Sequence, residues 1–209
     1  MKYEEIPHVT LERLALYHRT LQQLEERGFD IISSQQLSGF LNIKPEKLRR
    51  DLSYCGSFGT RRVGYPVSEL KRQLGKFLGL HYHRRIGIVG AGHLGMALAI
   101  DKTFLELGFS VAALFDKNEK LIGSEIGNVK IYDFAKLEST AKRKMIEIGV
   151  IAVPKDSAQE AADALVSAGI LGIWNFAPVK LFTPKNVPVL DADLSFGLRI
   201  LNYYITQAE

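Results

Sequence analysis

The sequence predicts an α/β protein of two domains, a helical domain followed by an open parallel sheet. Up to residue 84 the apolar residues recur at helical spacing, whereas from residue 85 short apolar runs alternate with helical segments. The first of these runs enters the stretch "GAGHLG", which is typical of a phosphate-binding turn between a strand and a helix. Together these observations indicate a doubly wound α/β sheet behind a helical domain.

Composition and charge narrow the class of protein. Of the 209 residues, 46% are apolar and 24% are charged, which suits a folded core. No apolar run reaches the roughly 18 residues that span a bilayer, and the first ten residues carry no export signal. We therefore expect a cytoplasmic protein with no membrane partner. Residues 1–85 hold 15 Lys and Arg against 9 Asp and Glu, which suggests a polyanion partner.

The first two helices are bounded by local signals. In residues 10–28 apolar residues recur every three or four positions, and Gly28 ends the run. Ser33 and Gln36 have capping-box spacing and begin a second helix. The residues that we expect to face the core are Leu11, Leu14, Tyr17, Leu21, Leu24, Leu37, Phe40 and Leu41.

A third helix follows a short turn and completes the outline of a helix-turn-helix. Pro45 suits its first position, and Gly56 closes it. Leu48 and Leu52 mark its buried side. The exposed side carries Glu46, Lys47, Arg50, Ser53 and Tyr54, with Arg49 and Asp51 on its two shoulders. Such a face suits the major groove of double-stranded DNA, where Arg can bridge guanine O6 and N7.

The segment "GSFGTRRVGYPV", residues 56–67, predicts a tight β-hairpin with Arg61 and Arg62 at or near its tip. A helix-turn-helix followed by a basic hairpin is a winged helix, and the wing meets phosphates or the minor groove. A fourth helix follows, for which Ser68 is the expected cap. Its inward-facing residues are Val67, Leu70, Leu74 and Phe77.

Six apolar runs are the expected strands of the second domain, and their spacing favours a Rossmann-like parallel sheet. They cover residues 85–90, 110–116, 129–132, 147–153, 170–176 and 187–190. The turn after the first strand aims helix N–H groups and a positive dipole at the phosphates of a dinucleotide. Its residues are Gly90, Ala91, Gly92, His93, Leu94 and Gly95.

An acid at the end of the second of these strands indicates which dinucleotide is bound. Asp116 lies 21 residues after Gly95, where a carboxylate accepts hydrogen bonds from ribose hydroxyls and repels a 2′-phosphate. This favours NAD(H) over NADP(H), although the adjacent Lys117 weakens the argument. The loops that we expect on the nicotinamide side contribute Val153, Pro154, Phe176, Ala177 and Pro178.

These loop residues offer no acid, base or nucleophile, so we expect a binding protein and not an enzyme. Tyr132 and Lys136 match the spacing of a dehydrogenase motif, but the glycine pattern before them does not fit that family. His81 and His83 lack a third ligand, so we expect no metal site. Cys55 would sense redox state if basic neighbours lowered its pKa, but its place on the apolar side of its helix favours packing.

Several motifs resemble one family in the right order along nearly the whole chain. They are "LRRDLSYCGSFGTRRVGY", "GIVGAGHLG", "IGVIAVP", "AGILGIWNFAPV" and "DADLSFGLRIL". The sequence is similar to the Rex family of bacterial redox-sensing repressors. The resemblance implies a homodimer with an N-terminal winged helix and a C-terminal Rossmann domain, which binds a palindromic operator and releases it when NADH binds.

The resemblance also assigns roles to particular residues. It places the DNA contacts on Lys47, Arg49, Arg50, Tyr54, Arg61 and Arg62. It implies that a terminal helix at about residues 194–206 is exchanged between subunits, and that Asp193 switches partners as the nicotinamide binds, with Arg19 as its cation. A position that often holds tyrosine is Asp101 here, which leaves the discrimination between NADH and NAD+ open. The domains that we expect are residues 1–80, 81–192 and 193–209.

Two alternatives remain open. A small NAD-dependent dehydrogenase is opposed by the basic N-terminal domain and by the absence of catalytic groups. A coenzyme A-binding regulatory domain is opposed by Asp116, which disfavours a phosphate on the adjacent ribose.

Overall fold

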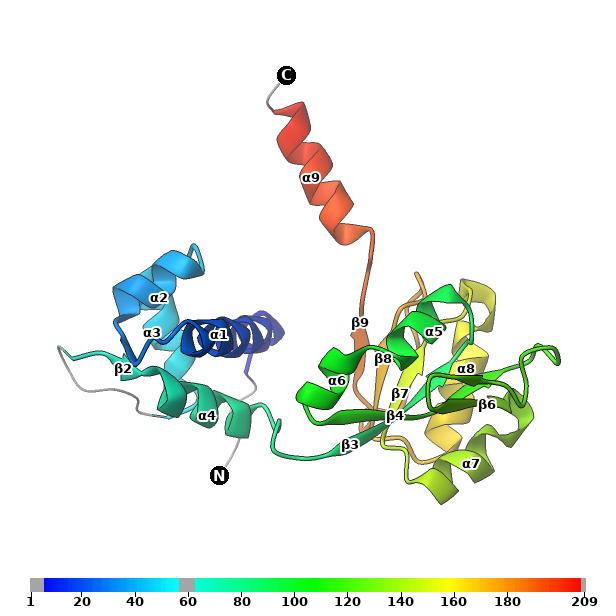
Figure 1. Ribbon diagram of the computed structural model, residues 1–209. Helices are drawn as coiled ribbons and strands as arrows, with labels where there is room; N and C mark the ends of the chain where they lie inside the picture. The colour runs from blue at the N-terminus through cyan, green and yellow to red at the C-terminus, as the bar shows by residue number, and fades with distance from the viewer. Residues whose placement is uncertain (1–5, 57–62, 208–209) are drawn as a thin grey trace. The chain divides into compact units, whose positions relative to one another are not determined.

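The structure is a computed structural model that describes residues 6–56 and 63–207. The chain divides after Tyr82 into two compact units (Figure 1). Unit 1 is mainly helical, and unit 2 contains a seven-stranded sheet. Within the described ranges, no helix is long and apolar enough to cross a membrane.

Local chemistry sets the helix boundaries of unit 1. Its described elements are α1 (His8–Glu26), β1 (Ile31–Ile32), α2 (Ser34–Phe40), α3 (Pro45–Ser53), β2 (Tyr65–Pro66) and α4 (Val67–Phe77). Ser33 and Gln36 form the predicted capping box of α2, and Pro45 opens α3. The prediction that Ser68 caps α4 is wrong, because the helix begins at Val67 and Pro66 occupies the capping position.

The core of unit 1 is made by one face of each helix. The buried apolar residues are Leu14, Tyr17, Leu21, Leu24, Ile32, Leu37, Leu48, Leu52, Tyr65, Val67, Leu70 and Leu74. Two inward-facing predictions are wrong, since Leu11 is 37% exposed and Phe40 is 52% exposed. In the first turn of α1, Thr10 is buried instead. Phe40 ends α2, and its ring meets that of Phe29 edge-on on the surface.

A short two-stranded sheet joins β1, which lies between α1 and α2, to β2, which precedes α4. Ile32 pairs with Tyr65 and Ile31 with Pro66 in antiparallel register, and β1 is an element that the sequence did not predict. Gly64 takes φ +107°, and a Cβ there would lie 2.7 Å from the carbonyl oxygen of Ile32. The predicted tip of the hairpin, with Arg61 and Arg62, lies outside the described residues.

Unit 2 is built on a doubly wound sheet, as predicted. Its strands are β3 (Arg84–Val89), β4 (Phe109–Asp116), β5 (Glu125–Ile126), β6 (Val129–Asp133), β7 (Ile148–Ile151), β8 (Gly172–Asn175) and β9 (Val189–Asp191). They lie in the order β5-β6-β4-β3-β7-β8-β9. The pairs that join β6, β4, β3, β7, β8 and β9 are all parallel, whereas β5, which was not predicted, is antiparallel to β6.

The order of the strands fixes where a ligand can bind. The chain runs from β3 outward to β4 and β6, then returns to the other side of β3 as β7. Ligands of such sheets bind outside the carboxyl ends of the strands where the order reverses, here between β3 and β7. The helical connections are α5 (His93–Ala99), α6 (Lys102–Glu106), η1 (Phe134–Lys136), α7 (Leu137–Lys144) and α8 (Lys155–Ser167).

The last helix, α9 (Phe196–Thr206), exposes apolar side chains all along its length. No residue of α9 is buried. The exposed large apolar residues on it and just before it are Leu194, Phe196, Leu198, Ile200, Leu201, Tyr203, Tyr204 and Ile205. A helix with apolar residues on several sides is normally buried, but nothing in the described part of this chain covers α9.

A buried carboxylate ties α1 to α3. The Arg13 guanidinium donates from Nε and Nη2 to the two oxygens of Asp51, each at 2.6 Å, and the Tyr17 hydroxyl donates to Asp51 Oδ2 at 2.7 Å. Asp51 is only 3% exposed, so its predicted place on the shoulder of an exposed face is wrong. Burial alone would raise the pKa of Asp51, but the hydrogen bonds from Arg13 and Tyr17 outweigh it and hold that pKa below the ordinary value.

Replacing Asp51 by Ala should destabilise unit 1 strongly. The change leaves the mostly buried Arg13 without its partner, and breaking such a pair from one side costs about 3–5 kcal/mol. The measurement is the free energy of opening of α1 amides by hydrogen exchange in the full chain. Glu46→Ala is the control, because it removes an acid from the same helix whose pair with Arg49 is exposed. Equal losses in the two variants would contradict the assignment.

The same carboxylate should make unit 1 sensitive to acid. Because the pKa of Asp51 is lower in the folded chain than in the unfolded chain, its contribution is complete above the unfolded pKa. The contribution is lost as the pH falls through the folded pKa. The opening free energy of Asp51→Ala should therefore approach that of the wild type only at acidic pH.

Candidate functional site

The glycine turn brings three segments of unit 2 into backbone contact. Gly90 takes φ +103°, and a Cβ on it would lie 2.5 Å from the carbonyl oxygen of Ala152, which follows β7. A Cβ on Gly95 would lie 1.9 Å from the carbonyl oxygen of Gly90, so α5 packs directly on the turn. A Cβ on Gly92 would meet nothing within 4 Å, so this side of the turn is open to a ligand.

The start of α5 has N–H groups available for an anion. Gly92 holds the N-cap position, and no side chain accepts a hydrogen bond from the first turn of α5. His93 begins the helix and is exposed, whereas Leu94 is partly buried. N–H groups and the helix dipole at such a terminus favour a phosphate.

Asp116 fastens the glycine turn to the end of β4. Its Oδ2 accepts a hydrogen bond from the N–H of Ala91 at 2.6 Å, and its Oδ1 accepts one from the N–H of Asn118 at 2.8 Å. Each carboxylate oxygen has a second lone pair, so Asp116 can still accept from two hydroxyl groups. This position and capacity are those required of an acid that binds the ribose of a dinucleotide.

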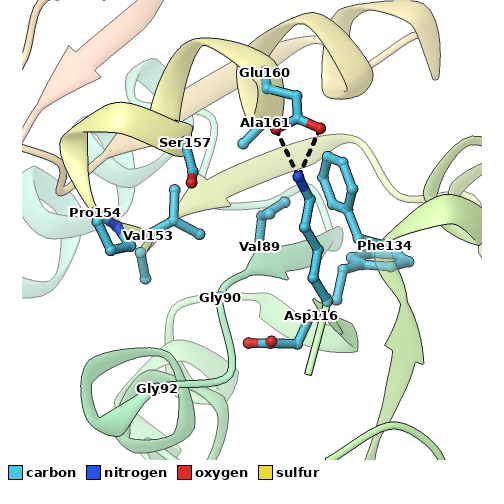
Figure 2. A pocket seen from close by; sticks show the side chains of 13 residues that line it. Val89, Gly90, Gly92, Asp116, Phe134, Val153, Pro154, Ser157, Glu160 and Ala161 are labelled. Atoms are coloured by element: carbon cyan, nitrogen blue, oxygen red, sulfur yellow. Dashed lines mark hydrogen bonds and ion pairs between the residues drawn. The ribbon is translucent and has the colours of Figure 1, made fainter. Parts of the chain in front are cut away.

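A pocket of about 270 Å³ opens beside the turn (Figure 2). It is lined by Val89, Gly90, Gly92, Phe115, Asp116, Lys117, Phe134, Ala152, Val153, Pro154, Ser157, Glu160 and Ala161. In Figure 2, Asp116 and Phe134 border it on one side, and Val153, Pro154 and Ser157 border it on the other. Sites for drug-sized ligands begin at roughly 300 Å³, so the pocket matches one half of a dinucleotide.

An ion pair crosses the rim of this pocket. Lys117 Nζ donates to both carboxylate oxygens of Glu160 on α8, each at 2.7 Å, as the dashed lines in Figure 2 mark. The same ammonium group lies 5.0 Å from the centre of the Phe134 ring. The sequence analysis missed Glu160, because nothing in a sequence links two charges that are 43 positions apart.

The loop after β8 does not line this pocket. Phe176 packs instead against Trp174, with ring centres 4.5 Å apart, and Ala177 is buried. A buried amide shapes the loop: Asn175 donates from Nδ2 to the carbonyl oxygens of Ala177 and Val179, and to Asp191 Oδ1 at 2.8 Å. Pro178 lies within the segment that these bonds hold. Asn175 is a second residue that the sequence analysis missed.

The outer face of α3 presents the predicted polar side chains. Lys47, Arg49, Arg50 and Ser53 are exposed, and Tyr54 is partly buried. Arg49 donates to Glu46 at 3.0 Å, an exposed contact that a phosphate or a base could displace at little cost. The other side of α3 is fixed by Leu48, Leu52 and the Asp51 network, which holds this face in one orientation relative to α1.

The three residues assigned to a conformational switch are exposed. Asp101 caps α6, where it accepts a hydrogen bond from the N–H of Thr103 at 2.9 Å, and it does not line the pocket. Asp193 accepts from the N–H and the hydroxyl of Ser195, and Arg199 lies 3.9 Å from it. Arg19 lies on α1 in the other unit. The side-chain hydrogen bonds from Thr103 and Ser195 hold the pKa values of Asp101 and Asp193 below the ordinary value.

Comparison with known proteins gives matches to both units. The family model described as "CoA binding domain" matches residues 81–179, and the one described as "Putative DNA-binding protein N-terminus" matches residues 5–53. A protein of Syntrophomonas wolfei named "Redox-sensing transcriptional repressor Rex" is 42% identical over 205 residues, which is 98% of each chain. A protein of the same name from Desulforamulus reducens is 39% identical over 209 residues, the whole of both chains.

Solved structures of a Rex-family repressor called RSP are also similar. The complex of RSP with β-NAD+ and operator DNA has a TM-score of 0.91 at 37% identity, covering 97% of this chain and 94% of that chain. The complex of RSP with β-NADH has a TM-score of 0.90 at 37% identity, covering 98% and 96%.

The single cysteine lies behind the face of α3 and not on it. Cys55 is partly buried and packs against the core of unit 1. Burial raises the pKa of its thiol to about 12, and the nearby negative charge of Asp51 adds to the shift. A raised pKa keeps the thiol protonated and inert at neutral pH, which opposes a role as a redox-sensing thiol.

Cys55 should therefore react slowly with a thiol reagent such as DTNB. At pH 8 we expect the rate in the folded chain to be at least about a hundredfold below the rate in the urea-unfolded chain, because the thiolate fraction is so small. Cys55→Ser supplies the background rate, since the chain has no other cysteine. Similar DTNB reaction rates in the folded and unfolded chains would support a role for Cys55 as a redox-sensing thiol.

Proposed function

This chain belongs to the Rex family of redox-sensing transcriptional repressors, and on that premise we propose that NADH binding to unit 2 releases unit 1 from operator DNA. The chain is a DNA-binding repressor that responds to NAD(H), and it is not an enzyme. The observation that carries the proposal is the pocket at the carboxyl ends of β3 and β4, where the glycine turn meets Asp116.

The adenosine half of NAD(H) would occupy this pocket, with its ribose hydroxyls on Asp116 and its pyrophosphate over the open side of Gly92. The residues that we assign to this half are Gly90, Ala91, Gly92, His93, Leu94, Gly95, Asp116 and Lys117. The nicotinamide half would extend along the switch point past Val153 and Pro154, towards Phe176, Ala177 and Pro178. The relative RSP has been solved with both redox forms of the cofactor, which supports one site for both.

The exposed face of α3 would enter the major groove. Its two arginines and Lys47 are exposed and supply positive charge. At 100° per residue, Arg50 lies on the side of the helix opposite Leu48 and Leu52. The residues that we assign to DNA are Lys47, Arg49, Arg50, Ser53 and Tyr54, together with Arg61 and Arg62 of the wing. The phosphate contacts would position the unit, and the base contacts would select the operator.

The uncovered apolar helix supports a homodimer as the assembled form. We propose that α9, within residues 193–209, is exchanged with a second copy of the chain and that residues 1–80 and 81–192 are the two domains. A two-fold dimer requires a palindromic operator with half-sites separated by whole helical turns. Chromosomal DNA and the NAD(H) pool both lie in the bacterial cytoplasm, which we propose as the location.

The release mechanism is a shift between two arrangements of the dimer. NADH can shift the population only if it binds the arrangement that cannot engage DNA more tightly than the one that can. Asp193 suits a switch, because its ion pair with Arg199 is long and exposed and costs little to exchange. Its new partner would be Arg19. Asp101 would act through the turn before α6, which its carboxylate caps.

Coenzyme A is the competing ligand, because the matching family model of residues 81–179 bears its name. Coenzyme A carries a phosphate on the ribose that would lie against Asp116, and like charges at this distance repel. We therefore expect thermal stabilisation by NADH and little by coenzyme A or NADPH. If coenzyme A raises the melting temperature more than NADH does, the ligand of this pocket is coenzyme A and not NAD(H).

Fluorescence anisotropy of a labelled palindromic Rex-type operator tests the proposal directly. At fixed salt we expect the chain to bind the duplex, NADH to release it and NAD+ to leave it bound. A complex that neither cofactor changes would contradict the sensing mechanism. A failure to distinguish the operator from a scrambled duplex would contradict the DNA-binding assignment.

Two substitutions should separate the two sites. Arg50→Ala should cost about 1–3 kcal/mol of operator discrimination and leave NADH affinity unchanged. Asp116→Ala should weaken NADH binding about tenfold or more while it spares DNA binding. Arg72→Ala is the charge-matched control for Arg50, because it removes an exposed arginine from α4 in the same unit. If Arg50→Ala keeps full discrimination, the assignment of the recognition helix is wrong.

A further inference from the structure

Asp116 and Lys117, neighbours at the end of β4, favour different cofactors, because one disfavours a 2′-phosphate on the ribose and the other attracts it. Asp116 favours a free 2′-hydroxyl, whereas a cation beside that position accommodates a 2′-phosphate in NADP-binding sites. Among the described residues that line the pocket, Lys117 is the only one with a positive charge. The preference for NAD(H) or NADP(H) therefore depends on whether the ammonium group of Lys117 is free to bind a 2′-phosphate.

The structure shows that Lys117 is engaged from two directions. Both oxygens of Glu160 accept from its ammonium group at 2.7 Å, and the Phe134 ring lies 5.0 Å from it. Glu160 lies on α8, across the pocket from β4, so the lysine is directed over the pocket rim and towards the opposite wall. An ammonium group that donates to two carboxylate oxygens has one donor left, so a phosphate would have to compete with Glu160 for the other two. Only a ligand with a 2′-phosphate meets this competition.

The net charge of the pocket rim also disfavours a 2′-phosphate. Asp116 and Glu160 contribute two negative charges against the single positive charge of Lys117. A 2′-phosphate would bring further negative charge into a net negative site, where the one cation is already paired. A 2′-hydroxyl carries no such penalty.

We propose that Glu160 is a positioning residue that determines cofactor specificity: it holds Lys117 away from the ribose and so makes the pocket reject NADP(H). This inference rests on the proposed function, in that the pocket binds the adenosine half of NAD(H). Asp116 and Glu160 then act together. Asp116 binds the hydroxyls, and Glu160 pairs with Lys117, the one cation among the described residues that line the pocket.

The ion pair suits this role because it contributes little to folding. The side chains of Lys117 and Glu160 are 58% and 57% exposed, and pairs exposed to this degree stabilise a fold only weakly. Glu160→Gln should therefore fold as the wild type does. Its effect should appear in the choice between two ligands that differ only in the 2′-phosphate.

The test is the ratio of the dissociation constants of NADPH and NADH, measured by titration of the full chain. We expect Glu160→Gln to shift this ratio towards NADPH by about tenfold, since one close negative charge is removed and Lys117 is released. Glu138→Gln is the matched control. Glu138 pairs with Lys142 on α7 at nearly the same exposure, 56% and 59%, and it does not line the pocket.

A second pair of variants tests whether Glu160 acts through Lys117. In a Lys117→Met background, Glu160→Gln should improve NADPH binding by much less than tenfold, because it removes only the repulsion from Glu160 and there is no cation to release. A tenfold gain that persists in that background would overturn the proposal, since Glu160 would then act by repulsion alone. A merely structural role would change both affinities in parallel and leave their ratio unaltered.

The outcomes separate this inference from the function on which it rests. If the wild type fails to bind NADH, the proposed function fails. If the wild type binds NADH but Glu160→Gln and Glu138→Gln give the same ratio, only the role of Glu160 is refuted.

Discussion

The close approach of two backbones at the carboxyl ends of β3 and β7 sets the form of unit 2. Side chains at Gly90 and Gly95 would collide with the carbonyl oxygens of Ala152 and Gly90. Their absence allows the strand, the turn and α5 to pack without a gap, and Asp116 fastens the assembly through the N–H of Ala91. The pocket lies where it does because those segments meet there, and the charged rim is built around that contact.

In unit 1, a network of charged and polar side chains around Asp51 positions α3 against α1. The helix that we propose as the DNA-reading element, α3, needs one face free of contacts, so it has to be positioned from the other side. Leu48 and Leu52 supply the apolar part of that support, while the Asp51 network fixes the angle of α3 against α1 through directional bonds. Burying a carboxylate costs desolvation energy, which the three hydrogen bonds that Asp51 accepts offset.

Local signals were sufficient to predict most elements from the sequence. Periodicity identified the stripe that contains Leu14 and Leu21, and the capping box identified the start of α2. The glycine spacing predicted the turn, and the spacing of the apolar runs predicted the doubly wound order. The stripe, the capping box and the turn each depend on residues close together in the chain, and the spacing of the apolar runs depends only on their order along it, so a single sequence carries these features.

The features that the sequence did not predict are pairings between distant positions. The residues of the Asp51–Arg13 and Lys117–Glu160 pairs are 38 and 43 positions apart, and either member alone reads as an ordinary surface charge. The strand β1 consists of two isoleucines, Ile31 and Ile32, which are too few to show the alternation of apolar and polar residues that predicts a strand. Phe40 satisfied the helical pattern but ends its helix, where the buried side is no longer enclosed.

The exposed pair of Lys117 and Glu160 also bears on how such a sensor can evolve. Codons for glutamate and glutamine differ at a single base, and the pair adds little to folding, so selection on stability would hardly oppose its loss. If Glu160 determines the cofactor as proposed, a gene of this kind lies one base change away from variants that respond to a different pool of reductant. The residues on α3 would be unchanged in such variants.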